Sequence, residues 1–253
     1  MNIVRVNTER GPKWGVVSAD QVRHLPNGPF GSLEPGASLG RLDDLHLLAP
    51  AVPSKIVCVG RNYAAHAAEH GAEVPTEPLL FLKPPSAVVA PGETIILPEL
   101  SARVEHEGEL ALVVGRQCRA VSPERAWEHV LGITCGNDVT ARDLQRKDSQ
   151  WTRGKGFDTF CPLGPWIKVG LGEDDVGDLN VSCTVNGERR QHARTSNMVF
   201  SPSVLIAYIT QVMTLEPGDV VMTGTPSGVG PLAQGDEVTV EIERVGTLTN
   251  PVA

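Results

Sequence analysis

Basic residues are the minority among the charged side chains, and this argues against a nucleic-acid partner. The 253 residues include 22 Lys and Arg against 30 Asp and Glu, which gives a formal net charge of −8. A protein that binds nucleic acid needs a basic face to neutralise phosphates. We therefore expect this chain to bind no nucleic acid.

Long apolar runs and paired cysteines are also missing. No apolar run approaches the roughly 20 residues that a membrane helix needs. Residues 1–11 lack the basic segment followed by an apolar segment that marks a signal peptide. The five cysteines are widely spaced and form no C-x-x-C motif, which is typical of reduced thiols. These absences predict a cytoplasmic protein with no membrane contact.

Aromatic residues make up only 4% of the chain, so aliphatic side chains must fill the core. The 26 Gly and 20 Pro indicate short elements joined by defined turns. Short apolar or alternating runs predict strands near residues 3–6, 14–17, 55–59, 79–82, 110–114, 181–185, 220–223 and 238–242. Helical patterns are few and cover residues 64–70, 123–131 and 201–212. Strands dominate without a βαβ rhythm, so we expect an α+β, mainly β fold.

Two prolines, Pro50 and Pro53, mark a join in the chain. The strand-like runs before them are short and are followed by a loop rich in Gly and Pro. We expect a small N-terminal β domain over residues 1–50 and a main domain over residues 51–253.

Three acidic residues alternate at Glu105, Glu107 and Glu109. Alternate residues of a strand share one face, where three carboxylates repel one another unless a cation lies between them. A solvent-facing acidic edge is the other interpretation, but the run leads directly into the apolar residues 110–114. If this is a metal site, its oxygen ligands favour Mg²⁺ or Mn²⁺ over zinc.

A further carboxylate, Asp138, follows the apolar run 133–135. It could join the acidic strand as a third ligand, or it could cap a helix that begins near Thr140. Its spacing does not separate these two interpretations.

Basic residues gather over a short stretch of this acidic chain: Arg142, Arg146, Lys147, Arg153 and Lys155. They surround a polar segment, residues 148–156. The segment is either a solvated loop or a mobile basic loop that attracts an anion.

His66, Glu69 and His70 form an H-x-x-E-H pattern, the spacing of inverted zinc peptidases. That function requires a longer helix, whereas Gly71 ends this one. We favour a His66–Glu69 pair that orients and deprotonates water. A plain surface turn of helix remains open.

A glycine-rich run, residues 224–230, lacks the Gly-Lys-Ser/Thr ending of a nucleotide-binding loop. It favours a tight turn that directs Thr225 and backbone N–H groups toward a ligand carboxylate.

Taken in order, these segments resemble the fumarylacetoacetate hydrolase family. The matching strings cover residues 60–69, 81–84, 107–110, 138–143, 155–158 and 224–230. The resemblance implies a mixed β-roll catalytic domain, an accessory N-terminal domain and a homodimer that binds Mg²⁺ or Mn²⁺.

The resemblance also implies a role for individual residues. Its metal ligands are Glu107, Glu109 and Asp138, with Glu105 as a neighbour. Its water-activating dyad is His66 and Glu69, on a segment that acts as a lid. The positions that hold the substrate's carboxylate and oxo groups, or neutralise its charge, are Arg142, Gln145, Lys155 and Thr225.

The expected partner is a small anionic 2-oxo acid, and the expected reaction is hydrolytic cleavage of a C–C bond in an acylpyruvate through an enolate. The same site would also suit isomerisation of a 2-hydroxyhepta-2,4-diene-1,7-dioate or decarboxylation of oxaloacetate. Zinc-peptidase chemistry and non-catalytic binding are more distant alternatives.

Overall fold

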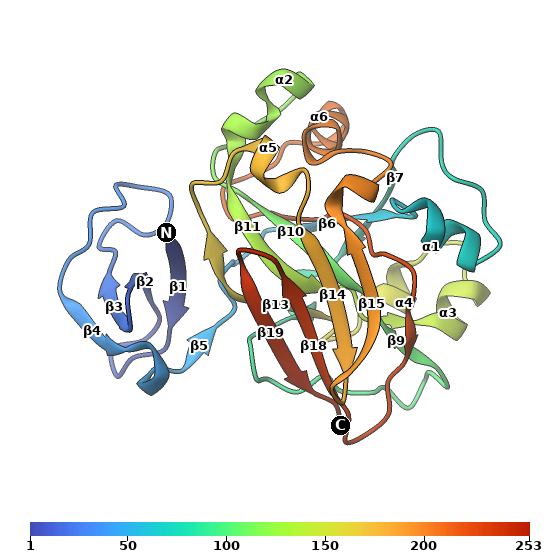
Figure 1. Cartoon of the computed structure of the whole chain (residues 1–253), viewed down its shortest axis with the longest axis horizontal. Helices are drawn as coiled ribbons and strands as arrows, with labels where there is room; N and C mark the ends of the chain where they lie inside the picture. The colour runs from blue at the N-terminus through green and yellow to red at the C-terminus, as the bar shows by residue number, and fades with distance from the viewer.

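The computed structural model describes residues 1–253 and consists mainly of strands, as the sequence predicts (Figure 1). The strands are β1 (Asn2–Val6), β2 (Lys13–Ser18), β3 (Gln21–His24), β4 (Ser38–Arg41), β5 (Leu47–Leu48), β6 (Ile56–Gly60), β7 (Leu79–Lys83), β8 (Val88–Val89), β9 (Val104–His106), β10 (Gly108–Val114), β11 (Val130–Asn137), β12 (Thr140–Ala141), β13 (Cys161–Lys168), β14 (Asn180–Val185), β15 (Glu188–Arg194), β16 (Val220–Met222), β17 (Gly230–Pro231), β18 (Glu237–Ile242) and β19 (Gly246–Pro251). The helices are α1 (Ala64–Glu69), α2 (Pro123–Ala126), α3 (Arg142–Lys147), α4 (Thr152–Lys155), α5 (Glu173–Val176) and α6 (Pro202–Val212).

The largest sheet has its main strands in the order β4-β3-β2-β1-β13-β11-β10-β16-β6-β7. Most neighbours are antiparallel, but β6 runs parallel to β16 and β8 runs parallel to β13. Every residue of β10 is buried. A strand covered on both faces needs apolar residues on both, which explains the continuous apolar run over residues 110–114.

A second sheet, β15-β14-β18-β19, packs in front of the first (Figure 1). Its strand β18 buries Val238, Val240 and Ile242 and leaves the residues between them more exposed, as the alternating sequence predicts. The turn between β14 and β15 has Asn186 and Gly187 at positive φ, the conformation that an Asn-Gly pair favours in a tight hairpin. The main hydrophobic core joins residues of β10, β11, β14 and β18, so it lies between the two sheets.

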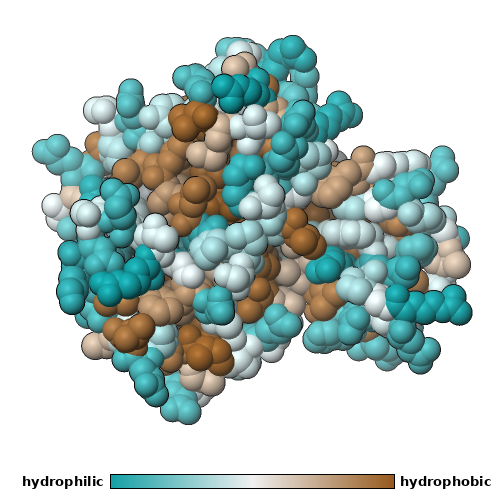
Figure 2. All heavy atoms as spheres, turned by 180° about the vertical axis from the view of Figure 1, so that it is seen from behind, coloured by the Kyte–Doolittle hydropathy of each residue, from teal (hydrophilic) through white to brown (hydrophobic).

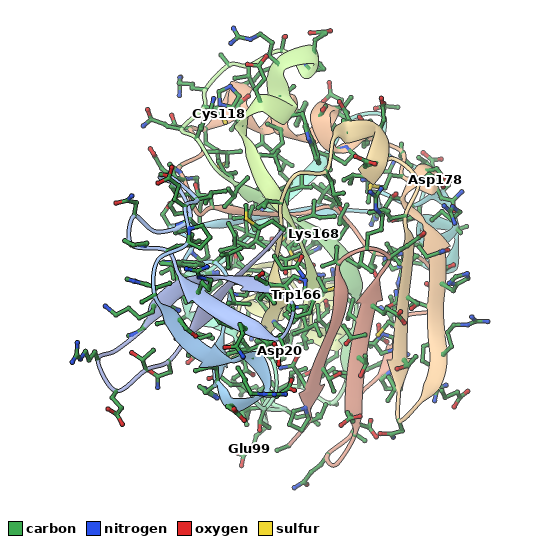
Figure 3. All side chains as sticks on the ribbon, turned by 60° about the vertical axis from the view of Figure 1, so that its left-hand side comes forward. Asp20, Glu99, Cys118, Trp166, Lys168 and Asp178 are labelled. Atoms are coloured by element: carbon green, nitrogen blue, oxygen red, sulfur yellow. The ribbon has the colours of Figure 1, made fainter.

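The N-terminal strands β1 to β4 form a lobe at one side of the molecule (Figure 1). Val4, Val6 and Val22 form its small core, and Trp166 of β13 packs against that core (Figure 3). The lobe continues the large sheet, because Ile3 of β1 pairs with Ile167 of β13. The domain boundary at residue 50 stays a prediction.

Two local expectations are wrong. The helix expected over residues 123–131 ends as α2 at Ala126 and continues only as a 3₁₀ turn, because Val130 already pairs with Val114 of β10. Pairing within a buried sheet here overrides local helical propensity. The basic segment 148–156 is not simply a solvated loop: it contains α4, whose Lys155 is buried among carboxylates.

On the face opposite to that of Figure 1, hydrophobic side chains form clusters on the larger lobe of the molecule, with hydrophilic side chains between and around them (Figure 2). The helices of the protein are short, and none has the length and apolar character required to cross a membrane.

Candidate active site

Three buried carboxylates meet where β11 ends and its neighbour β10 begins. The antiparallel register places Asn137 opposite Gly108, and the Asp138 N–H donates to the Glu107 carbonyl at 2.8 Å. The side chains of Glu107, Glu109 and Asp138 then each offer an oxygen within 4.8 Å of the others. The sequence placed these three residues together only through the family resemblance.

Glu105 does not belong to this group, although the alternation predicts one shared face. The strand is interrupted at Glu107, between β9 and β10. Glu105 accepts hydrogen bonds from Arg103 and from Arg142, both at 2.6 Å. Asp138 is likewise no helix cap, since α3 begins only at Arg142.

Two buried lysines bind the carboxylates directly. Lys155 donates to Glu107 and to Asp138, each at 2.7 Å. Lys83 donates to Asp138 at 2.5 Å and to the Val139 carbonyl at 3.0 Å. The lysines therefore offset the charge on Asp138 and part of that on Glu107. Sequence reasoning gave Lys83 no role, because a lone lysine at the end of an apolar strand carries no motif.

Arg142 and Gln145, expected to hold substrate, lie beside these groups. Arg142 also donates to Glu107, and it donates to Gln145 at 2.5 Å. Burial opposes ionisation of Glu107, but Lys155 and then Arg142 hold the pKa of Glu107 below its ordinary value. In this structure the polar groups of Arg142 are engaged with protein acceptors.

Glu109 has no cationic partner. Its carboxylate accepts a hydrogen bond from the Gly224 N–H at 2.8 Å. Burial, and then the nearby Asp138 and Glu107, raise the pKa of Glu109 well above its ordinary value. A buried carboxylate in this position needs either a proton or a cation. The all-oxygen donor set fits a hard divalent cation such as Mg²⁺ or Mn²⁺.

Replacing Lys83 by methionine should destabilise the protein by about 3 kcal/mol, because it leaves part of the charge on Asp138 buried without a partner. Urea unfolding in the presence of a chelator measures this change. Lys168→Met is the matched control, since Lys168 is on the same sheet and makes no ion pair, and should shift stability by less than about 0.5 kcal/mol. Equal effects of the two substitutions would contradict this role for Lys83.

The His66–Glu69 pair forms on α1. His66 Nδ1 lies 3.1 Å from Glu69 Oε2, and Glu69 Oε1 accepts the Gly228 N–H at 2.9 Å. The i, i+3 spacing on the short helix brings the two side chains together. Glu69 is thus held from both sides, and it orients the His66 ring with its other nitrogen free.

The loop over residues 224–230 binds the protein's own carboxylates with its backbone. Its Gly224 and Gly228 N–H groups donate to Glu109 and Glu69, so it connects the acidic cluster to the dyad. The Thr225 hydroxyl donates to the Gly108 carbonyl at 3.0 Å and accepts from Gln191 at 2.7 Å. Gln191 is a positioning residue that the sequence did not reveal.

These groups surround one cavity of about 460 Å³. It is lined by 16 residues, which include His66, Glu107, Glu109, Asp138, Arg142, Gln145, Lys155 and Thr225. All predicted site residues except Glu69 therefore line it, and Glu69 contacts His66. Arg61 and Arg146 also line the cavity, and neither makes an ion pair. No cysteine lines it, and all five are buried free thiols.

The model of the fumarylacetoacetate (FAA) hydrolase C-terminal family matches residues 55–253. The chain belongs to the fumarylacetoacetate hydrolase family. A second model, described as Rv2993c-like, N-terminal, matches residues 1–50.

Three relatives of this fumarylacetoacetate hydrolase family member carry different names. Protein Rv2993c of Mycobacterium tuberculosis is 49% identical over 94% of this chain and 90% of its own. The oxaloacetate tautomerase FAHD2B of Bos taurus mitochondria is 45% identical over 83% of this chain and 70% of its own. The crystal structure of 2-hydroxyhepta-2,4-diene-1,7-dioate isomerase from Mycobacterium marinum has a TM-score of 0.92 and 44% identity, and covers 100% of this chain and 98% of its own.

Proposed function

We propose that this protein is a divalent-metal-dependent enzyme that hydrolyses the C–C bond of an acylpyruvate. The observation that carries the proposal is the His66–Glu69 pair, with Nδ1 and Oε2 3.1 Å apart, on the wall of a cavity that also contains the acidic cluster. A base beside an oxygen-ligand metal site is suited to generate a nucleophile next to a chelating 2-oxo acid.

The dyad would perform the proton transfers. Glu69 would hold the His66 ring in place through Nδ1, and His66 would take a proton from water through its free nitrogen. The water oxygen adds to the distal carbonyl carbon, and the bond from that carbon to the pyruvate methylene breaks. The acyl group leaves as a carboxylic acid, and the pyruvate enolate takes up a proton at its methylene carbon.

Glu107, Glu109 and Asp138 would hold the cation, which when bound supplies a Lewis acid at the oxo and carboxylate oxygens. Lys155 is directly beside that position and lies 2.7 Å from two of the three carboxylates. Its positive charge would stabilise negative charge that develops in the cavity. Burial of these groups makes such interactions stronger than they would be in water.

A second candidate is proton transfer alone, as in isomerisation or tautomerisation of an enol. The names of the isomerase and the tautomerase among the relatives favour it. It would use the same His66–Glu69 pair as a proton shuttle. Oxaloacetate decarboxylation would also pass through a pyruvate enolate.

A panel of substrates separates these reactions. Chelator-stripped protein would be assayed with and without Mg²⁺ or Mn²⁺ on acetylpyruvate, fumarylpyruvate and oxaloacetate. Pyruvate release from an acylpyruvate that requires metal supports hydrolysis. Release from oxaloacetate alone identifies a decarboxylase. Loss of enol absorbance without pyruvate release identifies proton transfer, and no turnover of any compound favours a binding protein.

Two unpaired cationic side chains of the cavity predict a preference for substrates with two carboxylates. Replacing Arg61 and Arg146 by glutamine should raise KM for fumarylpyruvate by about 10–100-fold, since a hydrogen bond to a charged group contributes about 1.5–3 kcal/mol. KM for acetylpyruvate, which has one carboxylate, serves as the internal control and should change by less than about three-fold. An equal rise for both substrates would contradict a role in recognising the second carboxylate.

A further inference from the structure

His70 is next to the dyad but has no part in the proposed reaction. It follows His66 by one turn and completes the H-x-x-E-H sequence. His66, Glu69 and His70 each offer a ligand atom, and these atoms lie within 4.8 Å of one another. Both histidines line the cavity.

The protein itself leaves a polar atom of His70 unused. Nε2 of His70 is buried and has no hydrogen-bond partner. Its ring meets that of His66 nearly at right angles, with centroids 4.7 Å apart. Buried polar atoms are nearly always paired, so an unpaired one points to a partner that the chain does not supply.

We propose that His66, Glu69 and His70 form a second cation site, selective for zinc-like transition metals, and that its occupation switches the enzyme off. The binding part stands on these three side chains alone, and the inhibitory part rests on the proposed function of the dyad.

The donor chemistry separates this site from the acidic cluster. Two imidazole nitrogens and one carboxylate are the ligand set of open zinc sites, whereas three carboxylates favour Mg²⁺. Zinc–nitrogen bonds of about 2.0–2.1 Å place neighbouring ligand atoms roughly 3.3 Å apart. The ligand atoms would therefore have to approach one another by up to about 1.5 Å. Neither Glu69, whose side chain is 31% exposed, nor the half-buried His70 is locked in the core, and the Glu69 contact with His66 would be replaced by contacts with the cation.

Occupation of this site would remove the base. A bound cation takes the nitrogen lone pair of His66 and the Glu69 carboxylate that holds the His66 ring in place. Water can then no longer transfer a proton to the dyad, while the acidic cluster still holds its own metal. Inhibition should therefore persist when Mg²⁺ is in large excess.

The test is a zinc titration of the wild-type enzyme with saturating Mg²⁺. We expect turnover to fall as zinc is added, not to recover with further Mg²⁺, and to return when a chelator removes zinc and Mg²⁺ is resupplied. With inhibition expressed relative to each variant's own turnover without zinc, His70→Asn should require at least about ten-fold more zinc for the same fractional inhibition. His192→Asn, the same change at an exposed histidine of β15, should respond as the wild type does.

Calorimetry provides a readout that does not depend on turnover. With Mg²⁺ present, the wild type should bind one zinc ion more than His70→Asn. If no 2-oxo acid is turned over but this difference is measured, the proposed function fails and the site stands. Recovery of activity with excess Mg²⁺, or equal zinc binding by the wild type and His70→Asn, would overturn the site.

Discussion

Asparagine in place of His66 is expected to lower kcat for acylpyruvate cleavage by about 10²–10⁴, the usual contribution of a general base. The substituted side chain cannot accept a proton from water. The carboxylates of the acidic cluster keep all their hydrogen bonds, because His66 is bound to Glu69 and not to them. Steady-state kinetics together with Mg²⁺ titration calorimetry would therefore show lost turnover with unchanged metal affinity.

Glu69→Gln is the companion variant for this dyad. It retains an oxygen that can accept the Gly228 N–H but loses the negative charge beside the His66 ring. We expect a smaller loss, about 10–100-fold. If either variant cleaves acylpyruvates at the wild-type rate, the dyad does not activate water.

Removing the charge of Glu109 should greatly weaken the proposed binding of Mg²⁺. Glu109 is the carboxylate of the cluster without a cationic partner, so its charge is available to a divalent ion. Glu109→Gln keeps the shape of the side chain and an acceptor for the Gly224 N–H. We expect Mg²⁺ affinity and metal-stimulated turnover to fall by more than about 100-fold, beyond the effect of losing a residue that only supports a ligand.

The control for Glu109 is Glu105→Gln, which changes an acid of the same sequence run that lies outside the cluster. Glu105 binds Arg103 and Arg142, so its loss should affect stability more than Mg²⁺ affinity. Calorimetry on both variants compares the two positions directly. A larger loss of affinity in Glu105→Gln would mean that the cation is bound elsewhere.

Most strands were predictable because short local patterns of apolar and polar residues indicate which side chains are buried. The alternation of residues 238–242 and the Asn186-Gly187 turn need only their immediate neighbours to be interpreted. The helix expected to reach Leu131 failed because β11 takes its conformation from pairing with β10, a partner distant in sequence. Local helical propensity contains no information about such pairing.

In the candidate site, too, contacts between sequence neighbours were predictable and contacts between distant residues were not. The spacing of His66 and Glu69 on one helix predicts their contact, and the structure confirms that they meet. The ion pair of Lys83 with Asp138 joins two residues that are 55 positions apart in the chain, and no sequence motif indicates it. The role of Gln191 depends on the second sheet reaching Thr225. Dimerisation and the assigned catalytic roles stay predictions.

The pairing of β1 with β13 bears on how the chain folds during synthesis. Asn2 and Ile3 are synthesised well before their partners on β13, Lys168 and Ile167, so this edge of β1 stays unpaired until β13 has been made. The candidate site is completed later still, because Gly224 and Gly228 can donate to Glu109 and Glu69 only after they leave the ribosome. Contacts between such distant residues slow folding and prolong the exposure of unpaired strand edges. Nascent chains of this protein should therefore depend on chaperones until late in translation.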